Sequence, residues 1–267
     1  MSRRNFLQVL PTLGASSLLS GPLLGACSPA SPAAAASVPP GPSPRRKIRG
    51  ICFDLFTLFD PRSVVTVATS IVGEQGPSLC DAWRLRQFEY CWLRVAAKRY
   101  VDFRVVTDEA LRFAAKSKQL TLSEEARRAM VDAYSQLTPW PDAHAALVAW
   151  KQQGLRLAPL ANYAPAMLGG LLAHAGFTDL FTTQISTDIA QTFKPDPAAY
   201  ALGESRLGLA REELAFAAFG GWDAAGAKWF GFPTFWVNRL GVTPEQLIEP
   251  DATGSTLAEL SEFVARW

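Results

Sequence analysis

The chain has 267 residues, of which 49% are apolar and 19% are charged, and this composition predicts one or two globular domains rather than a disordered protein. The formal net charge of +2 is unevenly distributed, because residues 1–47 hold five basic and no acidic residues and leave 21 basic and 24 acidic residues in the remainder. A weakly acidic remainder has no general attraction for nucleic acid or for an anionic membrane, so any anion it binds must be captured locally.

The first 27 residues have the features of an export signal. Arg3 and Arg4 precede a moderately apolar stretch that ends in small residues, and "SRRNFLQ" resembles the signal of the twin-arginine route. The following "LLGAC" resembles a lipoprotein box, which would make Cys27 the lipidated first residue of the mature chain. We therefore expect export to the periplasm or cell envelope with a lipid anchor at Cys27. The alternative is an N-terminus that stays in the cytoplasm.

Residues 28–47 predict a tether between this signal and the folded part. The segment "SPASPAAAASVPPGPSP" is uncharged and rich in proline and alanine, so it cannot bury a hydrophobic core. At roughly 3 Å per residue, such a spacer would hold a domain some tens of Å from a membrane. The folded part is expected to begin near Lys47.

The first expected strand ends on a carboxylate. "RGICF" (residues 49–53) is short and apolar, and Asp54 follows it among aromatic and aliphatic residues. Burying an unpaired carboxylate costs free energy. Asp54 is therefore expected either to be paired at the strand end or to react.

A helical insert is expected after this strand. Residues 64–139 carry helical periodicity, most clearly in "DAWRLRQFEYCWLRVAAKRYVDF" and "TDEALRFAAKSKQ". Arg84 and Phe88 share one helical face by their i, i+4 spacing, which places a single cation among apolar neighbours. The alternative for Arg84 is a surface ion pair with Asp81 or Glu89.

From residue 142 onward, helical and strand patterns alternate. The short apolar segments "LRLAPL", "TQIST", "LAFAAF" and "TFWV" indicate strands, and helical segments separate them. Such alternation predicts a parallel sheet with right-handed crossovers. We therefore expect an α/β fold: a Rossmann-like core from residues 48–63 and 140–267, and an α-helical cap, residues 64–139, inserted over the catalytic edge of the sheet.

Four polar residues follow these strands closely, namely Asp54, Asn162, Lys194 and Asp223. Open α/β sheets bind their ligands at the carboxyl ends of the strands. Each residue also has a structural explanation, such as a turn for Asn162 or, for Asp223, the N-cap of a helix beginning near Ala224. Taken together they predict a site in which Lys194 keeps Asp54 ionised and reactive.

The cysteines and histidines indicate neither a metal site nor a histidine-based triad. No CxxC pair or Cys/His cluster is present among the four cysteines, and both histidines lie in helix-like segments. We therefore expect no zinc ion.

The folded part resembles the haloacid dehalogenase superfamily, specifically its L-2-haloacid dehalogenase branch. The segment "LCDAWRLRQFEYCWLRVAAKRYVDFRVVTDEALRFA" resembles the helical cap of that branch, and "FKPDPAAY" and "GWDAAGAKWFGFPTFWVNR" resemble its later motifs. The similarity covers roughly residues 48–240. The resemblance implies hydrolysis of (S)-2-haloacids to (R)-2-hydroxyacids plus halide without a cofactor. It also implies a homodimer formed through the cap.

The resemblance implies a role for each candidate residue. Asp54 would attack C2 of the haloacid to form an aspartyl ester, which water then hydrolyses at the carboxyl carbon of the enzyme. Thr57 would hydrogen-bond this nucleophile and Lys194 would stabilise it, while Asp223 would hold the lysine and help to orient water. The substrate and halide would contact Arg84, Asn162, Tyr200 and the apolar wall residues Phe88, Phe103 and Trp222.

The nucleophile loop departs from the family pattern in two ways. Phosphatases of the superfamily have a second Asp two residues after the nucleophile, where this chain has Phe56. A halide leaves without a proton, so the loss of this acid favours dehalogenation over phosphomonoester hydrolysis and argues against a required Mg²⁺ ion. The branch also has a Gly before its threonine, whereas Phe56 runs directly into Thr57, which predicts a loop one residue shorter.

Three further positions lack polar side chains that the family has. Ala161 replaces a Ser, and Ala218 and Gly220 replace the Ser and Asn before the "WDAAGA" motif. Each lost buried hydrogen bond would cost about 1–3 kcal/mol in binding or rate, and backbone N–H groups near Gly220 and Gly221 are candidates to replace them. Two alternatives stay open: a hydrolase acting on another small organic acid, ester or phosphate, and a catalytically impaired anion-binding envelope protein.

Overall fold

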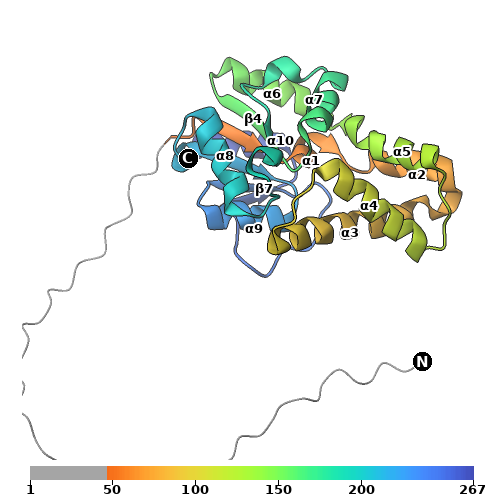
Figure 1. Cartoon of the computed structure of the whole chain (residues 1–267). Helices are drawn as coiled ribbons and strands as arrows, with labels where there is room; N and C mark the ends of the chain where they lie inside the picture. Colours follow the sequence, from red (N-terminus) through yellow and green to blue (C-terminus); the bar gives the residue numbers. More distant parts are fainter. Residues whose placement is uncertain (1–46) are drawn as a thin grey trace, which may run out of the picture. The chain divides into compact units, whose positions relative to one another are not determined.

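A computed structural model describes residues 47–267 of the chain (Figure 1). The predicted export signal, Cys27 and nearly all of the predicted tether lie outside the described residues. Among residues 47–267, no helix is both long enough and apolar enough to span a membrane.

A six-stranded parallel sheet with the order β5–β4–β1–β6–β7–β8 lies at the centre of the fold. Its strands are β1 (Gly50–Phe53), β4 (Arg156–Ala161), β5 (Ile185–Ser186), β6 (Leu214–Ala218), β7 (Thr234–Val237) and β8 (Ala252–Gly254). The chain runs outward from β1 through β4 and β5, then crosses to β6 and runs outward on the other side. The predicted Rossmann-like α/β architecture is therefore confirmed, and its topological switch point lies between β1 and β6.

Helices cover both faces of this sheet. Ile51 and Phe53 pack into one cluster of buried residues, and Cys52 packs into another, as the alternation of side chains along a strand requires. The helices of the first face are α6 (Ala143–Gln152), α7 (Pro165–His174) and α10 (Leu257–Arg266), and those of the second are α8 (Pro197–Leu207) and α9 (Gly221–Phe230).

The segment predicted as a cap is largely helical. It contains α2 (Ser63–Val72), α3 (Gly76–Ala97), α4 (Phe103–Ser117) and α5 (Glu124–Asp132). Asp102 and Ser123 cap the N-termini of α4 and α5 with their side-chain oxygens, and α3 packs against both α2 and α4. The division of the chain into a core and a cap domain stays a prediction.

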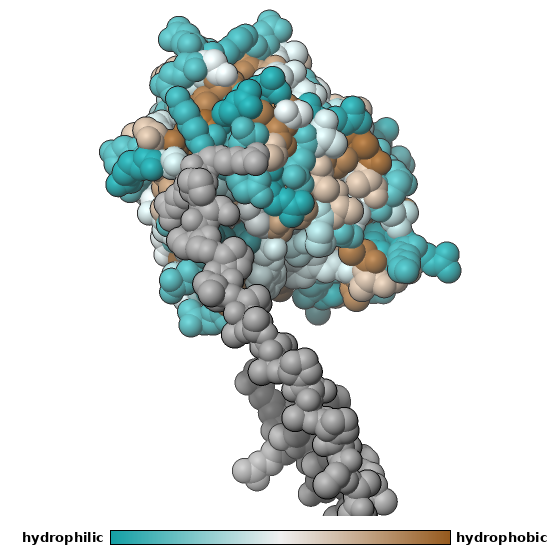
Figure 2. Space-filling view, turned by 90° about the vertical axis from the view of Figure 1, so that its left-hand side faces the viewer, coloured by the Kyte–Doolittle hydropathy of each residue, from teal (hydrophilic) through white to brown (hydrophobic). Residues whose placement is uncertain are grey.

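Two pairs of elements were not predicted. An antiparallel ribbon of β2 (Phe59–Asp60) and β3 (Thr138–Pro139) joins the two ends of the helical segment. At the C-terminus, β8 and α10 extend the sheet and one helical layer. Figure 2 shows one face of the molecule, on which hydrophobic side chains form separate patches among hydrophilic ones, as is ordinary for a folded domain.

Candidate active site

Asp54 lies at the carboxyl end of the central strand and begins the four-residue helix α1 (Leu55–Leu58). Its Oδ2 accepts a hydrogen bond from the Phe56 N–H (3.2 Å), so the residue is a helix N-cap. Its Oδ1 accepts a hydrogen bond from Lys194 Nζ (2.8 Å), and the side chain is 13% exposed. The Asp54 carboxylate therefore caps α1 and pairs with Lys194, and it remains accessible to solvent. It serves a structural role and is also free to react.

Lys194 is the buried cation of the site. Its side chain is 1% exposed, and its Nζ lies between Asp54 Oδ1 (2.8 Å) and Asp223 Oδ2 (2.7 Å). Burial alone would lower the pKa of Lys194, but the charges and hydrogen bonds of Asp223 and Asp54 outweigh burial and raise that pKa above its ordinary value. The lysine is therefore held charged between two carboxylates.

Asp223 lies inside the first turn of α9 and is wholly buried, so it is not the helix N-cap, which is Gly220. Its Oδ2 accepts from Lys194 and its Oδ1 accepts from the Tyr200 hydroxyl (2.7 Å). Burial raises the pKa of Asp223 to about 6; the charge of Lys194 opposes this rise and that of Asp54 adds to it. Asp223 is absent from the lining of the cavity described below, so its position supports holding Lys194 rather than contacting water there.

Tyr200 lies behind the site rather than in it. Its side chain is wholly buried, and its hydroxyl is directed at Asp223. Gly226 on α9 permits this approach, since a Cβ at that position would collide with the Tyr200 hydroxyl. The expected contact of Tyr200 with the substrate is therefore wrong. Because α8 packs on the same face of the sheet as α9, the Tyr200 hydroxyl reaches Asp223 instead of the cavity.

A cavity of about 140 Å³ opens beside Asp54. Six residues predicted for the site line it, namely Asp54, Arg84, Phe88, Phe103, Asn162 and Trp222. The lining also includes Phe56, Ala161 and Gly220, which were singled out as departures from the family pattern, and Leu55, Tyr163 and Phe219, which were missed. Each of these three residues directly follows a residue that the sequence analysis had singled out, namely Asp54, Asn162 or Ala218. Adjacency in sequence could therefore have identified them.

Arg84 brings a cation from α3 to this cavity. Its guanidinium carbon lies 4.0 Å from the ring centroid of Phe56 and 4.6 Å from that of Phe88. Its Nη1 is buried and has no hydrogen-bond partner among residues 47–267. Glu89 is paired instead with Arg86 (2.9 Å), and among residues 47–267 no ion pair joins Arg84 to Asp81 or Glu89, so the alternative of a surface ion pair is wrong. A buried donor without a partner beside a cavity indicates a place for an anion.

Asn162 directly follows β4 and lines the same cavity. Its Oδ1 accepts hydrogen bonds from the Lys194 main-chain N–H (2.8 Å) and from the Thr187 hydroxyl (3.4 Å). Because these donors engage the oxygen, the NH₂ group is the part of Asn162 that a ligand can use.

Thr57 does not hydrogen-bond the Asp54 carboxylate. Its hydroxyl donates to the main-chain carbonyl of Asp54 (2.6 Å), and its side chain is buried. The expected hydrogen bond therefore reaches the main chain of the nucleophile instead of its reactive group. In the short loop, Thr57 lies within the single turn of α1, where hydroxyl side chains commonly bond to a preceding carbonyl.

Gly220 leaves room for its neighbour Trp222. A Cβ at position 220 would lie 2.7 Å from Nε1 of Trp222, so the indole occupies the space in which a side chain would begin. The same indole contacts the ring of Phe88 (centroids 5.0 Å apart) and that of Trp92 (5.7 Å), both on α3. Where the family has a polar side chain, this chain has an aromatic wall.

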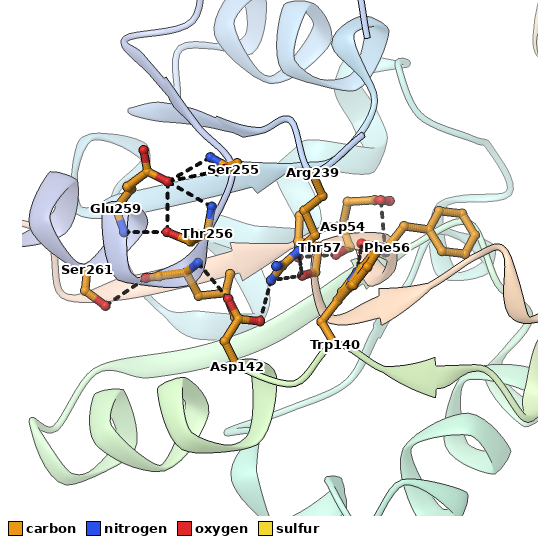
Figure 3. A network of polar contacts seen from close by, with 11 residues as sticks. Asp54, Phe56, Thr57, Trp140, Asp142, Arg239, Ser255, Thr256, Glu259 and Ser261 are labelled. Atoms are coloured by element: carbon orange, nitrogen blue, oxygen red, sulfur yellow. Dashed lines mark hydrogen bonds and ion pairs between the residues drawn. The ribbon is translucent and has the colours of Figure 1, made fainter. Parts of the chain in front are cut away.

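Three residues outside the cavity hold the nucleophile loop, as Figure 3 shows. Arg239 donates from Nε and Nη2 to the Thr57 carbonyl (3.1 Å each) and pairs with Asp142 (2.7 Å). Trp140 donates from Nε1 to the Phe56 carbonyl (2.9 Å). Sequence reasoning missed these residues, because no local pattern links position 57 to position 239.

Comparisons with known proteins agree with this geometry. Residues 48–231 match the family model of the haloacid dehalogenase-like hydrolases. The chain belongs to this family. It is 41% identical over 218 residues to the (S)-2-haloacid dehalogenase of Pseudomonas sp. (strain YL), a similarity that covers 81% of this chain and 94% of the relative.

Solved structures of L-2-haloacid dehalogenases have the same fold as this family member. The crystal structure of RSc1362 has a TM-score of 0.80 and 37% identity, covering 82% of this chain and all of the other. The enzyme of Xanthobacter autotrophicus with chloropropionic acid covalently bound has a TM-score of 0.77 and 35% identity, covering 82% of this chain and 98% of the other. The predicted membership of the L-2-haloacid dehalogenase branch is thereby confirmed.

The carboxylates of Asp54 and Asp223 lie around the ammonium group of Lys194. Within the part of the chain that the structure describes, no group of three or more His, Cys, Asp or Glu side chains could hold one. Between Asp54 and Asp223, the shared position is taken by the ammonium group of Lys194.

Proposed function

We propose that this hydrolase converts (S)-2-haloacids to (R)-2-hydroxyacids and halide through an aspartyl ester on Asp54. The observation that carries the proposal is a single small apolar cavity lined both by the Asp54 carboxylate and by the Arg84 guanidinium. As the negative charge of Asp54 is transferred to the departing halide, the Arg84 guanidinium in the cavity lining can receive it. The names of the relatives and the covalent chloropropionic acid complex of the Xanthobacter enzyme support the same reaction.

In the first step, Oδ2 of Asp54 attacks C2 of the haloacid from the side opposite the halogen. The new C–O bond forms as the carbon–halogen bond breaks, its electron pair leaves with the halide, and the configuration at C2 inverts. Oδ2 is the oxygen that Lys194 does not bind. The leaving halide needs no proton, which is compatible with Phe56 in place of an acid, and Arg84 and the amide of Asn162 line the cavity that receives it.

In the second step, water attacks Cγ of the aspartyl ester. The bond between Cγ and the ester oxygen breaks, the hydroxyacid leaves with one proton of the water, and the other proton passes to solvent as the Asp54 carboxylate is restored. Negative charge develops on Oδ1 during this attack, and Lys194 Nζ lies 2.8 Å from that atom. The ester itself is neutral, so Asp223 alone balances the charge of Lys194 until the Asp54 carboxylate is restored.

Incubation with (S)-2-chloropropionate tests the reaction, with chloride and (R)-lactate as the measured products. Asp54→Asn should abolish both products, because an amide is a far weaker nucleophile than a carboxylate. Asp60→Asn is the matched control, since Asp60 pairs with Arg62 outside the cavity lining. In a single turnover in ¹⁸O water, the label should appear in Asp54 and not in the lactate.

Two other outcomes would replace this proposal. Hydrolysis of p-nitrophenyl phosphate that requires Mg²⁺, without chloride release, would make the protein a phosphatase. Tight binding of a small acid with no turnover and no ester on Asp54 would make it an anion-binding protein, an outcome that the polar side chains missing at Ala161, Ala218 and Gly220 would explain.

We also propose export by the twin-arginine route, a lipid anchor at Cys27 and a homodimer formed through the helical segment 64–139. The sequence of the first 27 residues supports the first two, and the resemblance to the family supports the third. Cell fractionation of the full chain and of an Arg3→Lys, Arg4→Lys variant tests export, with retention of both proteins in the cytoplasm as the contrary result. Mass spectrometry of Cys27 and light scattering test the anchor and the dimer.

A further inference from the structure

The helix that carries the nucleophile is held from outside at two of its carbonyl groups. The helix α1 has only four residues, so its carbonyls cannot all find partners within the helix. The Phe56 carbonyl accepts from Trp140 Nε1 (2.9 Å), and the Thr57 carbonyl accepts two bonds from Arg239 (3.1 Å each) (Figure 3). Both donors come from segments more than 80 residues away in the sequence.

Arg239 is itself held firmly. Its side chain is 8% exposed, its Nη2 pairs with Asp142 Oδ1 (2.7 Å), and its guanidinium carbon lies 4.9 Å from the centroid of the Trp140 ring. The other oxygen of Asp142 accepts from the main-chain N–H of Leu257 (3.0 Å), the first residue of α10. The C-terminal helix is thus connected to the nucleophile helix through Asp142 and Arg239.

These contacts bear on the direction of the Asp54 carboxylate. The Thr57 hydroxyl bonds to the Asp54 main chain and not to its carboxylate, which leaves the Phe56 N–H and Lys194 to orient the reactive group. The Phe56 N–H belongs to α1, so its direction depends on how that helix is held. Displacement of an in-line nucleophile by about 1 Å is enough to reduce a rate by about 100-fold.

We propose that Arg239 is a positioning residue of the reaction, which acts with Trp140 and Asp142 by fixing the carbonyls of α1 and thereby the attack direction of Asp54. This inference rests on the proposed dehalogenase function. The Arg239 side chain does not line the cavity and does not contact the side chain of Asp54. Its effect is therefore on the rate of ester formation more than on substrate binding.

The test compares Arg239→Gln with Arg211→Gln. Arg211 has the same kinds of contact, to the Phe230 carbonyl (2.9 Å) and the Glu204 carboxylate (3.0 Å), but at the end of α9 away from the cavity. For (S)-2-chloropropionate, Arg239→Gln should lower kcat by about 10- to 100-fold with KM changed less than about threefold. Arg211→Gln should leave kcat within about twofold of the wild type, and added guanidinium should restore part of the kcat of Arg239→Ala.

Hydrogen exchange provides a readout that needs no turnover. The amides of residues 54–60 should exchange faster in Arg239→Gln than in the wild type and should be unchanged in Arg211→Gln. The proposal is overturned if both variants lose kcat in parallel with Tm and exchange of residues 54–60 does not change. A wild-type protein that releases no chloride overturns the proposed function instead, while the exchange comparison still decides whether Arg239 holds α1.

Discussion

Replacing Tyr200 with Phe should shift the pH dependence of the reaction, because the tyrosine hydroxyl stabilises the charged form of Asp223. Burial raises the pKa of Asp223 to about 6, against the charge of Lys194 and the hydrogen bond from Tyr200 (2.7 Å), both of which lower it. Tyr200→Phe keeps the ring that packs against Phe216 and Phe232 and removes only the donor. The effect of the substitution is therefore electrostatic.

The size of the shift follows from the strength of the lost bond. A hydrogen bond to a charged group contributes about 1.5–3 kcal/mol, and one pKa unit corresponds to about 1.4 kcal/mol. The pKa of Asp223 should therefore rise from about 6 to about 7–8 in Tyr200→Phe. Since an ionised Asp223 is needed to hold Lys194, the acidic limb of kcat/KM should move upward by the same amount.

The contribution of Asp223 to the free energy of unfolding should fall as the pH rises, whereas that of an ordinary paired carboxylate increases with pH. The pKa of Asp223 in the folded protein exceeds the ordinary carboxyl value of 3.8, so its contribution to stability is fully present below pH 3.8 and is lost as the pH rises through about 6. Raising the folded pKa further should destabilise Tyr200→Phe by about 1.5–3 kcal/mol at pH 8 and by much less at pH 5.

The assays are chloride release from pH 5 to 9 and urea unfolding at pH 5 and 8. Tyr100→Phe is the matched control, because it removes a tyrosine–aspartate hydrogen bond of 2.6 Å at Asp188, whose carboxylate is not paired with Lys194. The reasoning is refuted if the acidic limb of Tyr200→Phe coincides with that of the wild type and its loss of stability is equal at the two pH values.

Two other predictions concern the cavity wall and the buried cation. Gly220→Ala should push the Trp222 indole away from Phe88, because the new Cβ would lie 2.7 Å from Nε1. The ratio of kcat/KM for 2-bromohexanoate to kcat/KM for 2-chloropropionate should therefore rise relative to the wild type. An unchanged ratio would contradict this prediction. Lys194→Met should leave Asp223 buried without its cation and lower the free energy of unfolding at pH 8 by about 3–5 kcal/mol in urea titrations, whereas a loss below about 1 kcal/mol would show that the pair is not needed for stability.

The edge of the sheet was predictable because short apolar strands and the polar residues that follow them are adjacent in sequence. Asp54, Asn162 and Lys194 come after β1, β4 and β5, and parallel strands bring their carboxyl ends to one edge. The helix α10 also had an unused signal, the capping box of Thr256 and Glu259 ahead of an amphipathic run. Both features involve residues that are close together in the sequence, so the sequence alone is enough to predict them.

The features that the sequence did not predict depend on how deeply a side chain is buried, on strands too short to show a pattern, or on contacts between residues far apart in the sequence. Tyr200 was found as a motif residue, but only packing of α8 beneath α9 places its hydroxyl behind Asp223 instead of in the cavity. The ribbon of β2 and β3 consists of two-residue strands, too short to show any alternation. The contact of Arg239 with Thr57 joins residues 182 positions apart, and no periodicity in the sequence reports it.

The distribution of charge explains why this site suits a halide better than a phosphate. The carboxylates of Asp54 and Asp223 share Lys194, so the trio carries a net negative charge, and Arg84 is the cation among the residues lining the cavity. A phosphomonoester dianion would add two charges beside these carboxylates, and its leaving alkoxide would need a proton that Phe56 cannot give. A haloacid adds one charge, and the charge that moves during attack goes from Asp54 towards Arg84 while the total stays constant. In an apolar cavity, where charge separation is costly, this transfer favours displacement of a halide.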